Sequence, residues 1–302
     1  MSSADLARRF LHVNLNTVDI DAAQVFFADC LGLKLQMRTD PEVLNDGEIL
    51  GLSGRVRSET RFFYDSRGPR ASCAIEVIEW LDPATLARDQ SDTSTGLAAL
   101  GFVVADRTRV IETMSDHRFD ILSTDTEGLI TGGPAALVLG PDGVVIEIGQ
   151  LRGAATGTVH FAGARVACTD LQESISFYRA IGFDQIGSRH DDRVCHVGLT
   201  EDADSIRLCL TQDTAAATAP AHKVPNQQGL YRCALRVEDT RRAIAATSDG
   251  IAVRGPIWCP LPGTPIDGLD IAFMTAPDGV VIEYVERPLS HFSAPTNGRT
   301  SR

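Results

Sequence analysis

The chain lacks the features that mark several common protein classes. It has no apolar run near the roughly 20 residues that cross a bilayer, and its first nine residues lack the apolar core of a signal peptide. Positive charge is scarce, with 28 Lys and Arg against 40 Asp and Glu and a net charge of −12. Because phosphate binding needs a basic face, nucleic acid is excluded as a partner. The sequence therefore predicts a cytoplasmic protein that uses neither membrane nor nucleic acid.

Cysteine is sparse and unpaired. The seven cysteines are an odd number and form no Cys-x-x-Cys motif. Most of them lie in apolar, strand-like runs, so we expect buried, reduced thiols and no disulfide framework.

The sequence does contain a repeated segment. Pro-Asp-Gly-Val-Val-Ile-Glu occurs at 141–147 and again at 277–283. Each copy is a turn followed by a short β-branched run. Each ends on a glutamate, Glu147 or Glu283, where an apolar residue would pack better. The repeat indicates a duplicated fold, and the carboxylate present in both copies indicates a site.

A longer pattern surrounds these segments. A strand, a helix with an aspartate cap and three further strands recur four times, and the caps are Asp19, Asp106, Asp170 and Asp239. The sequence therefore predicts an α+β fold of four βαβββ units.

The composition also predicts where the chain divides. We expect a first domain over 1–151, a Gly- and Thr-rich linker over 152–158, a second domain over 159–288 and a polar tail over 289–302.

The first and third predicted helices carry related motifs. Phe26-Phe27 precedes Leu31-Gly32-Leu33, and Phe177-Tyr178 precedes Ile181-Gly182-Phe183. Together with the Pro-Asp-Gly segments and the paired units, they make the chain resemble the vicinal oxygen chelate superfamily over about residues 9–288. That superfamily includes glyoxalase I, bleomycin-binding proteins and extradiol dioxygenases. The resemblance implies two tandem half-barrel domains, a divalent metal ion and a small substrate that binds the ion through vicinal oxygens.

The resemblance also implies ligand positions on the first and fourth strands of each unit. In the first half of the chain these positions hold His12, Glu76 and Glu147, while Ala99 stands where a fourth ligand is common. One imidazole and two carboxylates suit Mn, Fe, Co, Ni or Zn. The first half is therefore the expected metal-bearing domain.

The second half holds Gly163, Arg232, Cys209 and Glu283 at the corresponding positions. A glycine has no ligating group, and a guanidinium repels a cation while it pairs with a carboxylate. We therefore expect the second half to have lost its metal, with an ion pair between Arg232 and Glu283.

Two pairings of the units are open. If the first unit pairs with the second, the site is His12, Glu76 and Glu147. If the first pairs with the fourth, Glu283 replaces Glu147 and Arg232 lies beside the site. Short connections favour the first arrangement.

The resemblance implies a metal-dependent isomerase, epimerase or lyase of the glyoxalase type, which transfers a proton next to a carbonyl. Glu147 would be ligand and base, and Tyr64 and Arg61 are candidates to reach the cavity.

An extradiol dioxygenase is the first alternative, although it needs two histidines and a carboxylate around Fe(II). A metal-free protein that binds or sequesters a small molecule is the second. We expect a monomer or a homodimer.

Overall fold

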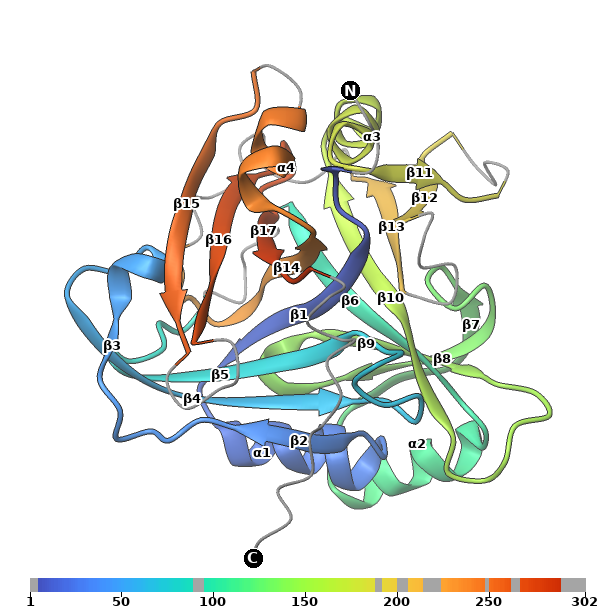
Figure 1. Ribbon diagram of the computed structural model, residues 1–302. Helices are drawn as coiled ribbons and strands as arrows, with labels where there is room; N and C mark the ends of the chain where they lie inside the picture. The colour runs from blue at the N-terminus through green and yellow to red at the C-terminus, as the bar shows by residue number, and fades with distance from the viewer. Residues whose placement is uncertain are drawn as a thin grey trace, which may run out of the picture.

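The computed structural model describes residues 5–88, 95–187, 192–199, 206–213, 224–247, 250–261 and 267–288. The predicted polar tail over 289–302 lies outside these residues. Within them the chain forms two large sheets and four short α-helices (Figure 1). In the described part of the chain, no helix has the length and apolar character needed to span a membrane.

The first sheet takes its strands from both ends of the chain, shown in blue and in orange to red in Figure 1. Its strands are β1 (Arg9–Thr17), β2 (Lys34–Arg38), β3 (Asn45–Asp46), β4 (Arg55–Tyr64), β5 (Ala74–Asp82), β14 (Gly229–Val237), β15 (Val253–Pro260), β16 (Gly268–Thr275) and β17 (Val281–Glu286). Their order is β15-β16-β17-β14-β1-β5-β4-β2, and β3 pairs with β4.

The second sheet takes its strands from the middle of the chain, shown in green and yellow. Its strands are β6 (Gly96–Val104), β7 (Ile121–Gly128), β8 (Gly133–Leu139), β9 (Val145–Gln150), β10 (Val159–Cys168), β11 (Phe183–Gln185), β12 (Val194–Leu199) and β13 (Arg207–Gln212). Their order is β11-β12-β13-β10-β6-β9-β8-β7.

The helices complete the four predicted βαβββ units. They are α1 (Ile20–Gln24) with its π-helical continuation η2 (Val25–Cys30), α2 (Arg107–Asp116), α3 (Leu171–Ala180) and α4 (Thr240–Ala246), and the turns η3 (Gly47–Leu50) and η4 (Pro141–Gly143) are 3₁₀. The predicted caps are confirmed, because a carboxylate oxygen of each aspartate accepts a backbone N–H of the first turn. The predicted α+β fold of four units is confirmed as well.

The prediction that the first unit pairs with the second is wrong. β1 of the first unit pairs antiparallel with β14 of the fourth, and β6 of the second pairs with β10 of the third. The second and third units are themselves neighbours along the chain, so the preference for short connections is met by this pair instead. Each sheet therefore joins one unit from each predicted half of the sequence.

A continuous apolar core connects the two sheets. The rings of Phe26 and Phe27 are fully buried, with centroids 5.3 Å apart. The centroid of Phe27 lies 6.5 Å from that of Phe102 in β6. Phe102 contacts Phe161 of β10 at 5.0 Å. Burial of each such ring contributes about 2 to 3 kcal/mol, so the Phe-Phe pair fixes the first unit against the second and third.

The first Pro-Asp-Gly turn, which belongs to the second sheet, forms hydrogen bonds with residues that flank strands of the first sheet. Asp142 adopts a left-handed conformation with φ of 58°. Its Oδ1 accepts the Val18 backbone N–H at 3.1 Å and the Gln228 amide at 2.8 Å. The turn of the second unit thus contacts both the first and the fourth units.

The second copy of the turn lies in an equivalent place. Asp278 is buried, accepts the Val280 N–H at 3.1 Å and lies 3.5 Å from the Tyr178 hydroxyl of α3. Each copy therefore links its own unit to the preceding unit of the same half.

We expect the Asp142→Asn variant to gain stability relative to the wild type as the pH rises. Burial raises the pKa of Asp142, although hydrogen bonds from Gln228, Thr17 and Val18 oppose the shift. Because the folded state then favours the neutral carboxyl, wild-type stability is lost as the pH rises through the folded-state pKa. Asparagine is always neutral, keeps the Oδ1 acceptor and tolerates the left-handed backbone.

Urea unfolding at pH 4 and pH 7 measures the effect. The exposed Asp116, at the end of α2, supplies the matched control Asp116→Asn. A stability difference between Asp142→Asn and wild type that is the same at both pH values would contradict the expectation.

Candidate active site

Four polar side chains from the central strands of the first sheet meet on one face of it. They are His12 of β1, Glu76 of β5, Arg232 of β14 and Glu283 of β17. Their side chains are 14%, 7%, 4% and 8% exposed. The four residues, which we call the barrel cluster, come from the first and fourth units, so the swapped pairing creates them as a group.

Arg232 lies between the two carboxylates. Its Nη2 donates to Glu76 Oε2 at 2.8 Å, and its Nε lies 2.8 Å from Glu283 Oε2. The second contact is an ion pair without hydrogen-bond alignment, so Arg232 Nε and Glu283 Oε2 both lack a hydrogen-bond partner. The predicted proximity of Arg232 and Glu283 is therefore present, and Glu76 shares the same cation.

The electrostatics of the cluster follow from this contact. Burial alone would raise the pKa of Glu283, but Arg232 and His12 outweigh it and lower that pKa below its usual value. Burial would lower the pKa of Arg232, and the charges of Glu76 and Glu283 overcome this and raise it. Glu283 and Arg232 are therefore both ionised at neutral pH.

His12 faces the same two carboxylates. Its Nε2 lies 3.5 Å from Glu76 Oε2 and 3.6 Å from Glu283 Oε2, longer than the usual hydrogen bond. The atom is buried and has no hydrogen-bond partner. The ring of Phe62 packs edge-on against the imidazole, with centroids 5.7 Å apart. One side of the imidazole is thus fixed by packing, while its Nε2 is left unsatisfied.

Two β-bulges bring the cluster together. One extra residue in β1, at Leu11, interrupts the register with β14 beside His12. A second bulge sets Tyr231 and Arg232 of β14 opposite the single residue Asn14 of β1. Such bulges re-aim side chains next to functional sites, and here one lies beside each of the two cationic or basic members of the cluster.

The donor set does not fit a metal ion as it stands. Ligand atoms around a tetrahedral ion are about 3.4 Å apart, and His12 Nε2 has nearly this spacing to both carboxylates. The same two carboxylate oxygens, however, each lie 2.8 Å from a nitrogen of Arg232. An ion among them would adjoin a permanent positive charge. Among the described residues, no three His, Cys, Asp or Glu side chains form a group that could hold a metal.

Glu147 lies in the second sheet, so it does not join His12 and Glu76 as sequential pairing predicted. Its Oε1 accepts the Thr131 backbone N–H at 2.6 Å and the Thr131 hydroxyl at 2.7 Å. The Ile130 N–H reaches both oxygens, at 3.0 and 3.2 Å. The carboxylate therefore holds the turn after β7.

That turn fills the face of the second sheet that corresponds to the barrel cluster. Ile130 packs against Ala99 and Cys209, two of the expected ligand positions. A side chain at Gly163, the third, would come within 2.1 Å of the Arg207 carbonyl oxygen. Burial raises the pKa of the Cys209 thiol to about 12, so this cysteine is a neutral apolar group at neutral pH. At these positions the second sheet therefore has no space for a metal-ligating side chain, whereas the first sheet carries polar side chains there.

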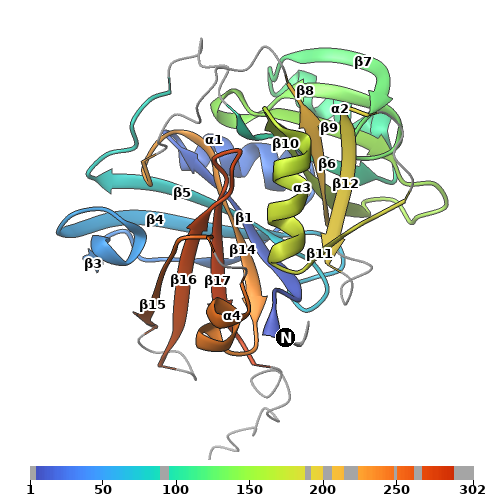
Figure 2. The ribbon, with the colours of Figure 1, turned by 90° about the horizontal axis from the view of Figure 1, so that it is seen from above.

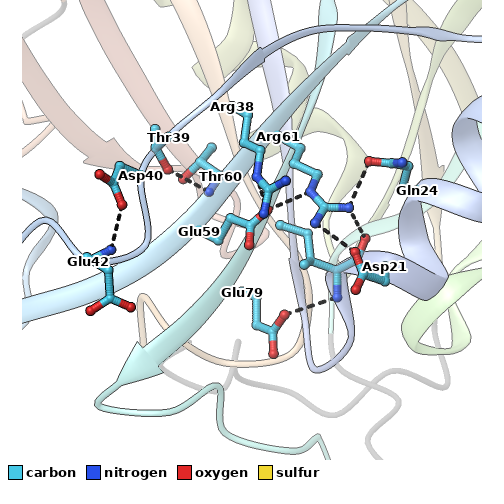
Figure 3. A network of polar contacts seen from close by, with 11 residues as sticks. Asp21, Gln24, Arg38, Thr39, Asp40, Glu42, Glu59, Thr60, Arg61 and Glu79 are labelled. Carbon is cyan, nitrogen blue, oxygen red and sulfur yellow. Dashed lines mark hydrogen bonds and ion pairs between the residues drawn. The ribbon is translucent and has the colours of Figure 1, made fainter.

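Arg61 is engaged with α1, where its guanidinium donates to Asp21 and Gln24 (Figure 3). Its guanidinium contacts Glu59 Oε1 and Asp21 Oδ1, both at 2.7 Å. Glu79 accepts the Ile20 backbone N–H at 3.1 Å nearby. These polar groups attach the first helix to the back of the sheet.

Tyr64 alternates with Arg61 along β4 and shares the face of Phe62. It is half-buried, and burial raises the pKa of its hydroxyl, an effect that the nearby Cys73 and Glu76 reinforce. The hydroxyl is therefore a proton donor at neutral pH.

A cavity of about 1020 Å³ borders the cluster at Arg232. Its wall joins strands of the first sheet to α3, which stands between the two sheets in Figure 2. Aromatic side chains line it on both sides, from Phe177 of α3 and from Tyr231 and Phe273 of the first sheet. Arg254, also in the wall, stacks over the Phe273 ring at 4.6 Å. Sequence reasoning missed this cavity, because the β14 bulge that exposes Tyr231 to it leaves no local signal.

Comparison with known proteins places the fold. The family model for the Glyoxalase/Bleomycin resistance protein/Dioxygenase superfamily matches residues 9–148 and 157–284. Glyoxalase I from Zea mays is similar with a TM-score of 0.68 at 20% identity, over 93% of this chain and 92% of that one. A Bacillus subtilis protein provisionally described as a dioxygenase gives a TM-score of 0.63 at 16% identity, over 96% and 89%. Among curated proteins, no sequence matches.

We expect Arg232→Met to lower the free energy of unfolding by about 3 to 5 kcal/mol, because it leaves two buried carboxylates without a cation. Adding Glu76→Gln and Glu283→Gln to the variant should recover a large part of the loss. Urea unfolding at pH 7 measures both. The exposed Arg241 of α4 gives the control Arg241→Met, expected within about 0.5 kcal/mol of wild type. Equal stabilities of Arg232→Met and Arg241→Met would contradict the buried ion pair.

Proposed function

Because the chain belongs to the Glyoxalase/Bleomycin resistance protein/Dioxygenase superfamily, we propose that it is an isomerase- or lyase-type enzyme acting on a small, oxygen-bearing metabolite. The metabolite enters the cavity beside Arg232, and the barrel cluster transfers a proton at a carbon next to its carbonyl group. The substrate has vicinal oxygens, as the resemblance implied.

The unsatisfied Nε2 of His12 carries this proposal. Buried polar atoms normally have a partner, and this one has none although two carboxylate oxygens face it at 3.5 and 3.6 Å. In this proposal, a group of the bound metabolite supplies the missing partner. An imidazole between two carboxylates suits proton transfer, since the carboxylates stabilise the imidazolium that forms when it takes a proton.

The remaining roles follow from position. Glu76 and Glu283 orient the imidazole and hold Arg232, and Arg232 meets the oxygen on which negative charge develops. Tyr64, which keeps its proton at neutral pH, is a second donor toward that oxygen. Glu147 has no part in this proposal, because its oxygens already accept hydrogen bonds from Ile130 and Thr131.

A metal-free binding protein is the second candidate, and the ion pairs of Arg232 favour it. The same cluster and cavity would then hold the metabolite without turnover. An extradiol dioxygenase has less support, since a single histidine enters the cluster. The cytoplasmic location and the choice between monomer and homodimer stay predictions.

We expect His12→Gln to slow proton transfer by about a hundredfold or more, the usual share of an acid–base group. The assay follows deuterium uptake by NMR at the carbon next to the carbonyl, in D2O, across a panel of 2-oxoaldehydes, hydroxyketones and 2-substituted oxo acids. His117→Gln, an exposed position at the end of α2, is the matched control and should exchange at the wild-type rate.

Two results would count against the enzyme. If wild-type protein binds panel members but exchanges no deuterium, the binding protein is the better description. If His12→Gln exchanges as fast as wild type, the proton is moved by another group.

A further inference from the structure

We propose that Arg232 takes the place of a divalent metal ion, so that the barrel of the first and fourth units carries its own cation. Its guanidinium forms ion pairs with Glu76 and Glu283 and faces the oxygens of the bound metabolite. The role toward the metabolite rests on the proposed function, whereas the replacement of the ion rests on geometry alone.

The charge balance of the cluster is the first argument. Glu76 and Glu283 are 7% and 8% exposed, and buried carboxylates need a cation or several donors. Arg232 supplies the cation from within the chain, at 2.8 Å from one oxygen of each. A divalent ion would have to replace or approach this fixed charge at the same oxygens.

The place of Arg232 in the repeat is the second argument. Arg232 lies seven residues before the cap Asp239, as His12 lies seven residues before the cap Asp19, and the register of the antiparallel pair sets it opposite Asn14, two residues along β1 from His12. The β14 bulge aims it at both carboxylates. A cation therefore stands where the repeat would otherwise provide a fourth ligand.

The second sheet shows how the same fold treats a carboxylate without a cation. Glu147 is 5% exposed, and hydrogen bonds from the turn at Ile130 and Thr131 satisfy it. Backbone N–H groups and the Thr131 hydroxyl donate to Glu147, whereas one guanidinium is shared by Glu76 and Glu283. The partners of the carboxylates thus come from the chain itself in both barrels.

The cavity gives the cation a ligand to act on. Arg232 lines the 1020 Å³ space, so a molecule held there would lie beside this residue. A guanidinium presents up to five N–H donors in one plane, a geometry that matches paired oxygens. The ligand class is a small molecule with two neighbouring oxygens, such as a 2-oxo acid or a hydroxyketone.

Cobalt binding tests the replacement without reference to activity. We expect purified wild-type protein to bind no Co²⁺ at the cluster in titrations to 1 mM. Arg232→His removes the charge and supplies an imidazole next to His12, Glu76 and Glu283. This variant should bind one Co²⁺ per chain at least about a hundredfold more tightly than wild type and show visible d–d absorption.

Two variants control the test. Arg241→His adds an exposed imidazole on α4 and should leave Co²⁺ binding as in wild type. The double variant Arg232→His with Glu283→Gln should lose most of the gain, since one ligand is gone. Circular dichroism and thermal unfolding establish that each variant is folded, and Arg232→Ala serves as a second route if the histidine variant is not.

The outcomes divide cleanly. One equivalent of Co²⁺ bound by wild type and lost in His12→Gln would overturn the replacement, as would a folded Arg232→His variant that binds no better than wild type. If no variant at position 232 folds, the wild-type titration alone decides. Deuterium exchange that survives EDTA supports the inference, whereas absent exchange would refute only the proposed function.

Discussion

The contact of one guanidinium with two buried carboxylates is the constraint on which the rest of this molecule depends. Neither Glu76 nor Glu283 is stable in the interior as a lone anion, and Arg232 lies 2.8 Å from both. The three side chains come from β5, β17 and β14, so the contact requires the first and fourth units to share a sheet. The bulge in β14 is then needed to aim the guanidinium. His12 faces two carboxylates that share this one guanidinium, and its Nε2 has no hydrogen-bond partner.

The turns and the strands of this chain connect different pairs of units. The two Pro-Asp-Gly turns connect units of the same half, since Asp142 accepts the Val18 N–H and Asp278 lies beside Tyr178. The antiparallel pairs β1–β14 and β6–β10 connect units of different halves. Each unit is therefore held by a turn on one side and by a strand on the other. The shared core through Phe27, Phe102 and Phe161 makes these connections one body.

Local features of the fold could be read from the sequence, and features that depend on partners could not. The four aspartate caps and the strand–helix order rest on neighbouring residues, which is why the helices begin where the pattern predicted. The choice between Glu147 and Glu283 depended on which units pair, and both pairings show the same periodicity along the chain. The bulge at Arg232 changes which face of the sheet a β14 side chain points to, and nothing in the amino-acid composition of the strand signals it. The repeat showed that Glu147 and Glu283 occupy the same position in the two sheets. It did not show that N–H groups would bind Glu147 and a guanidinium would bind Glu283, because these partners come from segments that pair only in the folded chain.

The two barrels also differ in what their carboxylates permit. In the second, Ile130 needs the space left by Gly101, where a Cβ would come within 2.4 Å of it, and Ile130 packs against Ala99 and Cys209. In the first, the carboxylates pair with the Arg232 side chain, and a cavity lies beside it. A guanidinium carries one delocalised charge, whereas a metal ion would bring two charges at a point, so it stabilises a developing enolate less strongly. Under the proposed function, proton transfer would therefore rely on closely placed partners, and the imidazole of His12, packed edge-on against Phe62 with its Nε2 lacking a hydrogen-bond partner, would be one of them.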